Sequence, residues 1–361
     1  MDSAQTNRPV DGRALLGGLK AAAEWFAANV PAINALNVFP VPDGDTGTNM
    51  NLTLQAALKD VQEDASVAVV AERVYRGALM GARGNSGVIL SQILRGLSQG
   101  FAAHATITPL EFVTALEQAA ATAYKAVIKP VEGTMLTVIR ETSEQLRASF
   151  SAAATMSWEE VLKVATDHAR SSVDGTPKYM KLLRDAGVVD AGGEGLFVLL
   201  QGALAFVRGE ALNVQAVHPA QAMAFDDVHT DDDFGYCTNF MIEGEAIPYE
   251  EVRATLADMG TSVVAVGDEH LVKVHIHMLR PGDALNYAMQ WGSLSAIEIT
   301  NMDNQRRDLH AADQAGGLLI DKGTEPVSDV GVVAVAPGEG FSRIFRSLNV
   351  GSVITGGQTM N

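Results

Sequence analysis

The sequence predicts a multidomain protein: an all-helical N-terminal bundle, a small α/β middle domain, and the start of a further α/β domain. Apolar residues recur at helical spacing up to about residue 210, and alternation with period two begins only after residue 235. A run of buried-strand type, GVVAVA, follows later at 331–336. The length of 361 residues suits two or three domains, and 47% hydrophobic residues suffice for real cores.

Apolar stripes in the N-terminal region predict amphipathic helices. One stripe consists of Ile89, Ile93, Leu97 and Phe101, four residues apart. Residues that favour helix starts precede such stripes, and Ser157 with Glu160 has the spacing of a capping box. The predicted caps are Asp11, Asp45 or Thr48, Ser86, Thr108 before Pro109, and Ser157. We predict a bundle of about eight helices within a domain over residues 1–212.

The pattern changes after an aspartate-rich break at 226–233. Short alternating runs and two helical stripes predict a compact α/β domain over residues 225–304. Its expected strands are 240–242, 262–266, 271–277 and 297–300, and its expected helices are 250–259 and 283–291. A linker at 305–329 then leads to residues 330–361, read as strand 331–336, helix 341–348 and strand 352–355. Such a β-α-β start would expose a sheet edge, so we expect a fragment of a third domain.

Charge and composition exclude several classes of function. A net charge of −17 and a pI of about 4.8 disfavour nucleic-acid binding and a polybasic membrane surface. One cysteine excludes an internal disulfide framework. The polar N-terminus lacks a leader, and no apolar run reaches the ~20 residues of a membrane span, so we expect a cytoplasmic protein.

The most informative stretch is NVFPVPDGDTGTNM, from Asn37 to Met50. Gly44 permits a tight turn in which Asp43 and Asp45 point to one side, where they repel unless a cation lies between them. Carboxylate oxygens of this kind suit Mg²⁺ bound together with phosphates. The residues that follow open a helix and offer N–H groups and hydroxyls to phosphate oxygens: Thr46, Gly47, Thr48 and Asn49.

A glycine-rich loop, Gly81 to Gly87, is predicted to open a second helix at Ser86. Its backbone N–H groups could hold an anion, and Arg83 could direct a positive charge at a transferred phosphoryl group. The predicted phosphate-binding residues are Gly84, Asn85, Ser86 and Gly87. A plain loop between helices, capped by Ser86, is the alternative.

The only cysteine, Cys237, forms a constellation with His275 and His277. Side chains at i and i+2 of a strand share a face, so both imidazoles can reach one ion. Cysteine with two histidines is a ligand set for Zn²⁺. A buried thiol beside a polar strand face, and a nucleophilic cysteine with a histidine base, are the alternatives.

The chain resembles the ATP-binding L-subunit domain of dihydroxyacetone kinases and, more closely, the A subunit of bacterial fatty acid kinases. The resemblance rests on NVFPVPDGDTGTNM, on GARGNSGVILSQ (81–92), on PVEGTMLTV (130–138) and on VVDAGGEGL (188–196). It continues through FGYCT and VKVHIH to the terminal GGQTMN, and so covers nearly the whole chain.

This resemblance implies an eight-helix barrel that holds ATP at one end with two Mg²⁺. Asp43 and Asp45 match the metal-binding aspartates, and Asn37 is the nearest candidate for a third aspartate of dihydroxyacetone kinases. An amide is a weaker Mg²⁺ ligand than a carboxylate. The resemblance places four further residues around adenine and ribose: Thr134, Met135, Asp190 and Gly192. It also implies the Cys and His-x-His of the middle domain as a zinc site.

The function that the resemblance implies is transfer of the ATP γ-phosphoryl group to a fatty-acid carboxylate, giving an acyl phosphate. A separate acyl-binding protein of the DegV-like type would present the acid, and the kinase would dimerise through its middle domain. A carboxylate acceptor needs no general base, which fits the acidic turn. Two alternatives stay open: a kinase for a small hydroxylated metabolite, and a non-catalytic regulator that retains ADP.

Overall fold

The computed structural model describes residues 8–153, 155–210, 235–302, 333–336, 345 and 352–355. The chain divides into two compact units, Met1–Asp303 and Asn304–Asn361. Three predicted segments lie outside the described residues: the charged break at 226–233, the linker at 305–329 and, apart from Phe345, the helix at 341–348. The predicted domain boundaries stay predictions.

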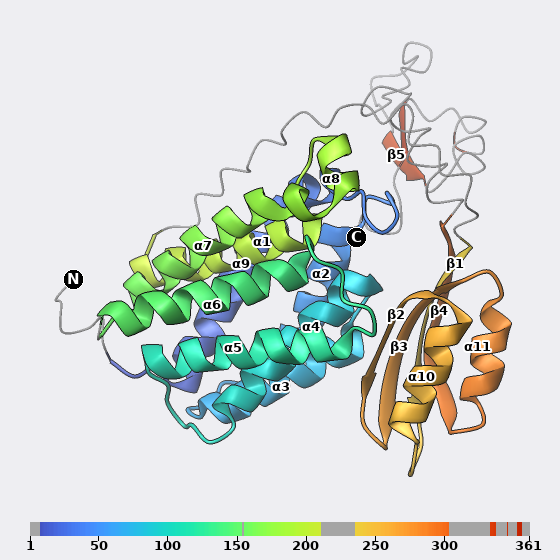
Figure 1. The fold of residues 1–361 in the computed structure, drawn as a ribbon, viewed down its shortest axis with the longest axis horizontal. Coiled ribbons are helices and arrows are strands. Elements are labelled where there is room, and N and C mark those ends of the chain that lie inside the picture. The colour runs from blue at the N-terminus through green and yellow to red at the C-terminus, as the bar shows by residue number, and fades with distance from the viewer. Residues whose placement is uncertain are drawn as a thin grey trace. The chain divides into compact units, whose positions relative to one another are not determined.

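The predicted helical N-terminal part is confirmed, and between residues 8 and 210 the described chain forms nine helices (Figure 1). None of the described helices is both long enough and apolar enough to cross a bilayer. The bounds are α1 Gly12–Ala35, α2 Thr46–Leu58, α3 Val67–Gly81, α4 Gly84–Phe101, α5 Pro109–Ala126, α6 Met135–Ala153, α7 Trp158–Tyr179, α8 Lys181–Ala186 and α9 Ala191–Arg208.

Local capping explains where several helices begin. The Asp11 carboxylate accepts the Ala14 N–H at 2.9 Å, and Thr108 and Ser157 each form a complete capping box, as predicted. The prediction that a helix opens at Ser86 is wrong by two residues. The Gly87 N–H already donates to the Arg83 carbonyl at 3.0 Å, so α4 begins at Gly84.

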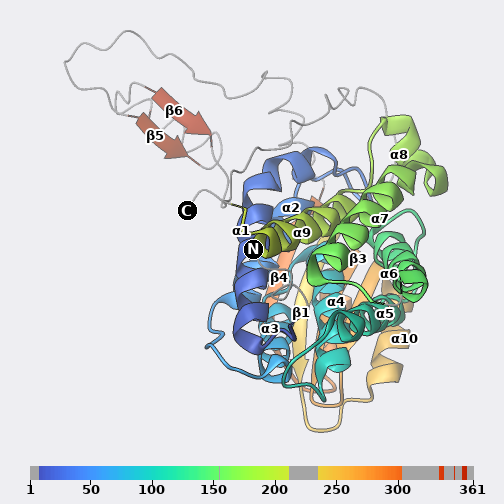
Figure 2. The same cartoon turned by 90° about the vertical axis from the view of Figure 1, so that its left-hand side faces the viewer.

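Large apolar side chains fill the centre of the helical part. Phe26, Ile33, Met50, Leu136 and Leu146 are almost completely buried and belong to one cluster. Helix α9 packs between α1 and α7, and Figure 2 shows the three helices side by side. This burial of one face of each helix supplies most of its stability.

The middle part is a four-stranded antiparallel sheet in the order β2-β3-β1-β4. The predicted strands and helices are present with bounds shifted by up to four residues: β1 Tyr236–Glu243, α10 Tyr249–Met259, β2 Thr261–Gly267, β3 Leu271–Met278, α11 Pro281–Ala288 and β4 Ser293–Asn301. A bulge in β4, with Ala296 at a positive φ of 47°, interrupts its pairing with β1. The bulge lets Ser295 and Glu298 both lie opposite residues of the same β1 face.

The two faces of this sheet have different neighbours. Figure 1 shows α10 and α11 on one face, where Val272, Val274 and Ile276 of β3 join the core. On the other face, Val264 and Val266 of β2 share a cluster with Leu79 and Val88 of the helical part. The residues that alternate with the first set, including His275 and His277, therefore point toward the helical part.

In the second unit the structure describes two strands, β5 Val333–Ala336 and β6 Ser352–Thr355. They pair in parallel, with Val333 opposite Ser352. Parallel pairing of consecutive strands is what the predicted β-α-β order requires.

Candidate active site

The acidic turn between α1 and α2 is braced by the Asn37 amide. Its nitrogen donates to the Val41 carbonyl at 2.7 Å, and its oxygen accepts the Thr46 N–H at 3.0 Å and also the Thr46 hydroxyl. Gly44 has a φ of +66°, which reverses the chain between the two aspartates. Since Asn37 uses its oxygen inside the turn, its predicted role as a metal ligand requires Thr46 to give up that contact.

Asp43 and Asp45 form a closely coupled carboxyl pair. Restricted access to water raises the pKa of Asp43 well above its ordinary value, and the charge of Asp45 and a hydrogen bond with it raise this pKa further. Restricted access to water also raises the pKa of Asp45. Without a cation, the pair therefore holds onto a proton that two exposed aspartates would have lost at neutral pH. A divalent cation would replace that proton.

The start of α2 and the glycine-rich loop pack directly on each other. Gly84 has a φ of +58°, and a Cβ there would lie 2.5 Å from the Asn49 amide nitrogen. The Ser86 hydroxyl lies 3.5 Å from the Thr46 carbonyl. The fold thus brings together two loops that the sequence indicated separately for phosphate, with Asn85 in the first turn of α4.

Gly47 and Thr48 are held by α1. The Asn34 side chain accepts the Thr48 N–H at 3.1 Å and donates to the Thr48 hydroxyl at 3.0 Å. A Cβ at Gly47 would lie 2.8 Å from the Val30 carbonyl oxygen. These contacts fix the first turn of α2, so its free N–H groups have a defined direction.

The starts of α6 and α9 are joined by the Asp190 carboxylate. It accepts the Gly193 N–H at 2.7 Å and a backbone hydrogen bond from Met135. Complete burial raises the pKa of Asp190 to about 7. Met135 packs against Gly192, and the Thr134 hydroxyl donates to the Val131 carbonyl at 2.8 Å.

Four helix N-termini therefore gather at one end of the helical part. Met50 of α2 packs against Gly195 of α9, which links the α2–α4 pair to the α6–α9 pair. Each N-terminus carries a partial positive charge and free N–H groups. In a chain with a net charge of −17, this end offers an anion a favourable place.

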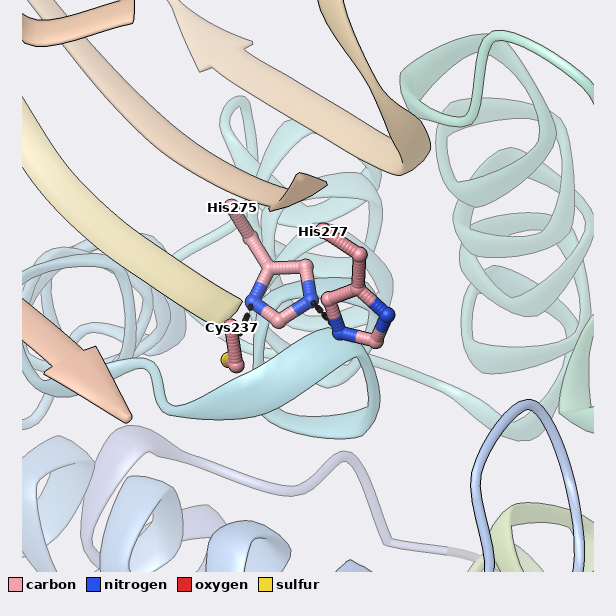
Figure 3. Close-up of side chains that lie close together, drawn as sticks. All are labelled: Cys237, His275 and His277. Carbon is pink, nitrogen blue, oxygen red and sulfur yellow. Dashed lines mark hydrogen bonds between the residues drawn. The ribbon is translucent and has the colours of Figure 1, made fainter. Parts of the chain in front are cut away.

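The Cys–His constellation forms on the sheet face that meets the helical part. The β1–β3 register pairs Cys237 with His277, and Cys237 Sγ lies 3.8 Å from His275 Nδ1. The Nε2 atoms of His275 and His277 are 3.1 Å apart, and one ligand atom from each of the three residues fits within 4.8 Å (Figure 3). Tetrahedral zinc separates two imidazole nitrogens by about 3.3 Å, so the histidine pair fits such an ion.

The protonation states of the three side chains follow from their burial. Burial lowers the pKa of His275 well below its ordinary value and that of His277 to about 4, so both are neutral. The Asn239 side-chain oxygen lies 2.8 Å from His275 Nδ1 and so favours a proton there, leaving Nε2 free as an acceptor. Burial and the charges of Asp45 and Asp43 raise the pKa of the Cys237 thiol to about 12, which disfavours a thiolate nucleophile without a metal.

These effects show that the acidic turn and the Cys–His constellation adjoin. Both aspartates act on the thiol, although about two hundred residues separate them along the chain. Arg83 Nη1 lies 3.4 Å from Glu298 Oε1, and Glu298 in turn raises the pKa of Asp45. The candidate residues thus belong to one site, with loops of the helical part on one side and the sheet on the other.

Sequence analysis missed three side chains of this site: Asn239, Lys273 and Glu298. Asn239 orients His275, and Glu298 pairs with Arg83. Lys273 lies two residues before His275 in VKVHIH, so the same alternation would have placed it on the same face. No local signal marks Glu298, because its position depends on the bulge in β4.

Three family models match the chain in order. Residues 40–205 match the DAK2 domain, which identifies the helical part as a domain of kinase type. Residues 233–309 match the middle domain of proteins like the A subunit of fatty acid kinase, and residues 331–361 match the C-terminal domain of the same proteins. The chain therefore belongs to the FakA-like family of fatty acid kinase proteins.

Curated relatives extend along almost the whole chain. Protein YloV of Bacillus subtilis is 39% identical over 371 residues, which cover 98% of this chain and 66% of that protein. An uncharacterized protein of Staphylococcus saprophyticus is 36% identical, with the same coverage of both chains. The chain thus spans 66% of the length of these relatives.

Among solved structures, the dihydroxyacetone kinase of C. freundii in its native form aligns with 18% identity and a TM-score of 0.39. The alignment covers 56% of this chain and 36% of the kinase. The same kinase in complex with AMP-PNP and Mg²⁺ aligns with 19% identity and a TM-score of 0.40, with the same coverage.

Proposed function

We propose that this chain is the nucleotide-binding part of a kinase that transfers the γ-phosphoryl group of ATP to a fatty-acid carboxylate. The product is an acyl phosphate. Membership in the FakA-like family supports this choice of reaction class and acceptor. A separate acyl-binding protein of the DegV-like type presents the acid, and the protein acts in the cytoplasm.

The observation that carries the proposal is the coupled pair Asp43 and Asp45 at the start of α2. Two carboxyl groups with raised pKa values lie beside four helix N-termini. The carboxylates favour a divalent cation and the helix N-termini favour phosphate oxygens. Mg²⁺ with a nucleotide triphosphate satisfies both requirements at once.

The donor chemistry of the turn fits Mg²⁺, with Asp43 and Asp45 as ligands and Asn37 as a third if its contact with Thr46 opens. Bound Mg²⁺ neutralises charge on the phosphates of the nucleotide. The free N–H groups of Thr46 to Asn49 and of Gly84 to Gly87 bind phosphate oxygens. Thr134, Met135, Asp190 and Gly192, at the starts of α6 and α9, contact adenine and ribose.

In the transfer step this chain's residues position charge and exclude water. A carboxylate oxygen of the acceptor forms a bond to the γ-phosphorus while the bond to the β,γ-bridging oxygen breaks. ADP leaves with that electron pair, and no proton moves because the acid is already ionised at neutral pH. Arg83, next to the start of α4, directs its positive charge at the transferred group once it is released from Glu298.

We also propose that Cys237, His275 and His277 bind Zn²⁺. Two neutral imidazoles with facing Nε2 atoms and a nearby thiol form a suitable donor set. Zinc binding would stabilise the sheet face that meets the nucleotide and displace the thiol proton. Homodimerisation through the middle domain is part of the same proposal.

One observation favours an alternative acceptor. The lack of a base in the acidic turn favoured a carboxylate, but the fold brings the neutral histidines of the sheet next to this turn. If no zinc is bound, an imidazole is available to take a proton from a hydroxyl group. A kinase for a small hydroxylated metabolite is therefore the second candidate, and it makes a different product.

The test is a phosphoryl-transfer assay with MgATP and one acceptor at a time. The acceptors are oleate with a DegV-like binding protein, oleate alone, and dihydroxyacetone. Hydroxylamine traps acyl phosphates as hydroxamates, so it distinguishes the two products. Asp45→Asn serves as the inactive control, and Asp60→Asn, at an exposed position, serves as the matched active control.

We expect hydroxamate only when oleate and the binding protein are both present. Phosphorylated dihydroxyacetone without hydroxamate would instead establish the alternative acceptor. ADP bound tightly without turnover of either acceptor would establish a non-catalytic regulator.

A further inference from the structure

Lys273 is the only buried lysine in the part of the chain that the structure describes. Its side chain is 4% exposed, whereas the seven other described lysines are all exposed. It makes no hydrogen bond and no ion pair with any described residue. A buried cation without a direct partner is costly, so its presence requires an explanation.

The strand register determines where this cation lies. Lys273 shares the face of β3 with His275 and His277, and it pairs with Met241 of β1 and Val266 of β2. Both neighbours are buried apolar side chains, and Val266 belongs to the cluster that joins the sheet to the helical part. The lysine therefore lies in an apolar surround at the junction where the candidate site forms.

Electrostatic neighbours connect Lys273 to the same site. Glu298 and Arg83 both act on it, and these two form the ion pair between β4 and the loop before α4. Two cations therefore share one carboxylate on this side, while Asp43 and Asp45 are reserved for metal. The local balance lacks an anion, and a phosphoryl group would supply one.

We propose that Lys273 is a catalytic residue whose Nζ binds an oxygen of the phosphoryl group during its transfer. The proposal rests on the proposed function. Three equatorial oxygens carry the charge of that group in the transition state, and a desolvated cation stabilises them more strongly than an exposed one. The lysine forms and breaks no covalent bond, and the nucleotide, acceptor and proton balance stays as described above.

The test compares Lys273→Met, which keeps the length of the side chain, with Lys273→Arg, which keeps the charge. Lys20→Met, at an exposed position of α1, is the matched control. Each variant is assayed for turnover of MgATP with oleate and its binding protein, for binding of MgADP, and for binding of MgADP with aluminium fluoride. This fluoride mimics the phosphoryl group in flight, and its binding requires no acceptor. Thermal unfolding checks the fold.

We expect Lys273→Met to lower kcat about a hundredfold to a thousandfold, as loss of one preorganised donor does, with KM for ATP and MgADP affinity within threefold. It should lose the extra affinity that aluminium fluoride gives the wild type, and Lys273→Arg should keep part of it. Because an unpaired buried charge is removed, its melting temperature should stay equal or rise.

Three results would overturn the proposal. Wild-type turnover in Lys273→Met would refute the role of Lys273 and leave the proposed function intact. A lower melting temperature together with loss of MgADP binding would assign Lys273 a structural role. If the wild type shows neither turnover nor a gain with aluminium fluoride, the proposed function and this inference both fail.

Discussion

Arg83 and Glu298 form an ion pair across the candidate site, with Nη1 and Oε1 3.4 Å apart. Arg83 precedes α4 in the helical part, and Glu298 lies on β4, 215 residues further along the chain. Because Glu298 also raises the pKa of Asp45, the pair couples the sheet to the acidic turn. In this state, Glu298 occupies the guanidinium group that we assign to the phosphoryl group.

Replacing Glu298 by Gln should affect binding far more than stability. Both partners are about half exposed, so we expect the free energy of unfolding to change by less than about 0.5 kcal/mol. Loss of the negative charge lowers the pKa of Asp45, so MgADP should bind severalfold tighter at pH 6 and less so at pH 8. Calorimetric titration at both values checks this, with Glu251→Gln of α10 as control. Equal affinity ratios at the two pH values would contradict the coupling.

Nucleotide should stabilise the protein only together with Mg²⁺. At a hundredfold excess over Kd, MgADP should add about 2.7 kcal/mol to the free energy of unfolding. In EDTA, or in Asp45→Asn with Mg²⁺, the gain should vanish because the carboxylate pair no longer bridges phosphate and metal. Thermal unfolding measures all three conditions. An equal gain in EDTA would exclude the metal bridge.

Removal of the Asp43–Asp45 repulsion should itself stabilise the nucleotide-free protein. The raised pKa values mean that the folded state binds protons more tightly than the unfolded state. Stability without metal therefore falls as pH rises above about 4, the pKa of an unfolded aspartate. Asp45→Asn should weaken this dependence in urea titrations from pH 4 to 8. A steeper dependence in the variant would refute the assignment.

Asp190 should contribute a second pH dependence of the same sign. Its pKa is about 7 in the folded protein, against about 4 in the unfolded chain, so its contribution is lost as pH rises through this window. The linkage amounts to on the order of 3 to 4 kcal/mol between pH 4 and 7. Asp190→Asn keeps an N-cap acceptor for Gly193 and should remove this part of the slope in urea titrations. Asp190→Ala should cost about 1 kcal/mol more, through loss of the cap.

Purified protein should contain about one Zn²⁺ per chain, and Cys237→Ser should lower this content. The sulfur is a stronger zinc ligand than a hydroxyl group, and metal binding releases the thiol proton. Elemental analysis measures the content. In chelator-treated wild type, slow alkylation by iodoacetamide at pH 8 is expected from the thiol pKa of about 12. Rapid alkylation would instead support the nucleophile alternative.

Much of the architecture was predictable because it depends on short-range patterns. Thr108 with Glu111 and Ser157 with Glu160 mark helix starts through contacts three residues apart. The bounds of the element that opens the glycine-rich loop were less predictable. Whether α4 starts at Gly84 or Ser86 depends on the conformation of Arg83, and Gly84 itself packs against Asn49 from another helix.

Two local pairings of the site follow from the order of residues alone: Asp43 with Asp45 across Gly44, and His275 with His277 on one strand face. Chain connectivity and the period of a strand suffice for these. Three further relationships required the folded chain: Cys237 lies opposite His277, Glu298 reaches Arg83, and Lys273 is buried without a direct partner among the described residues. Strand register, a bulge and the packing of the sheet on the helices determine those positions, and each depends on contacts between residues that are far apart in the chain.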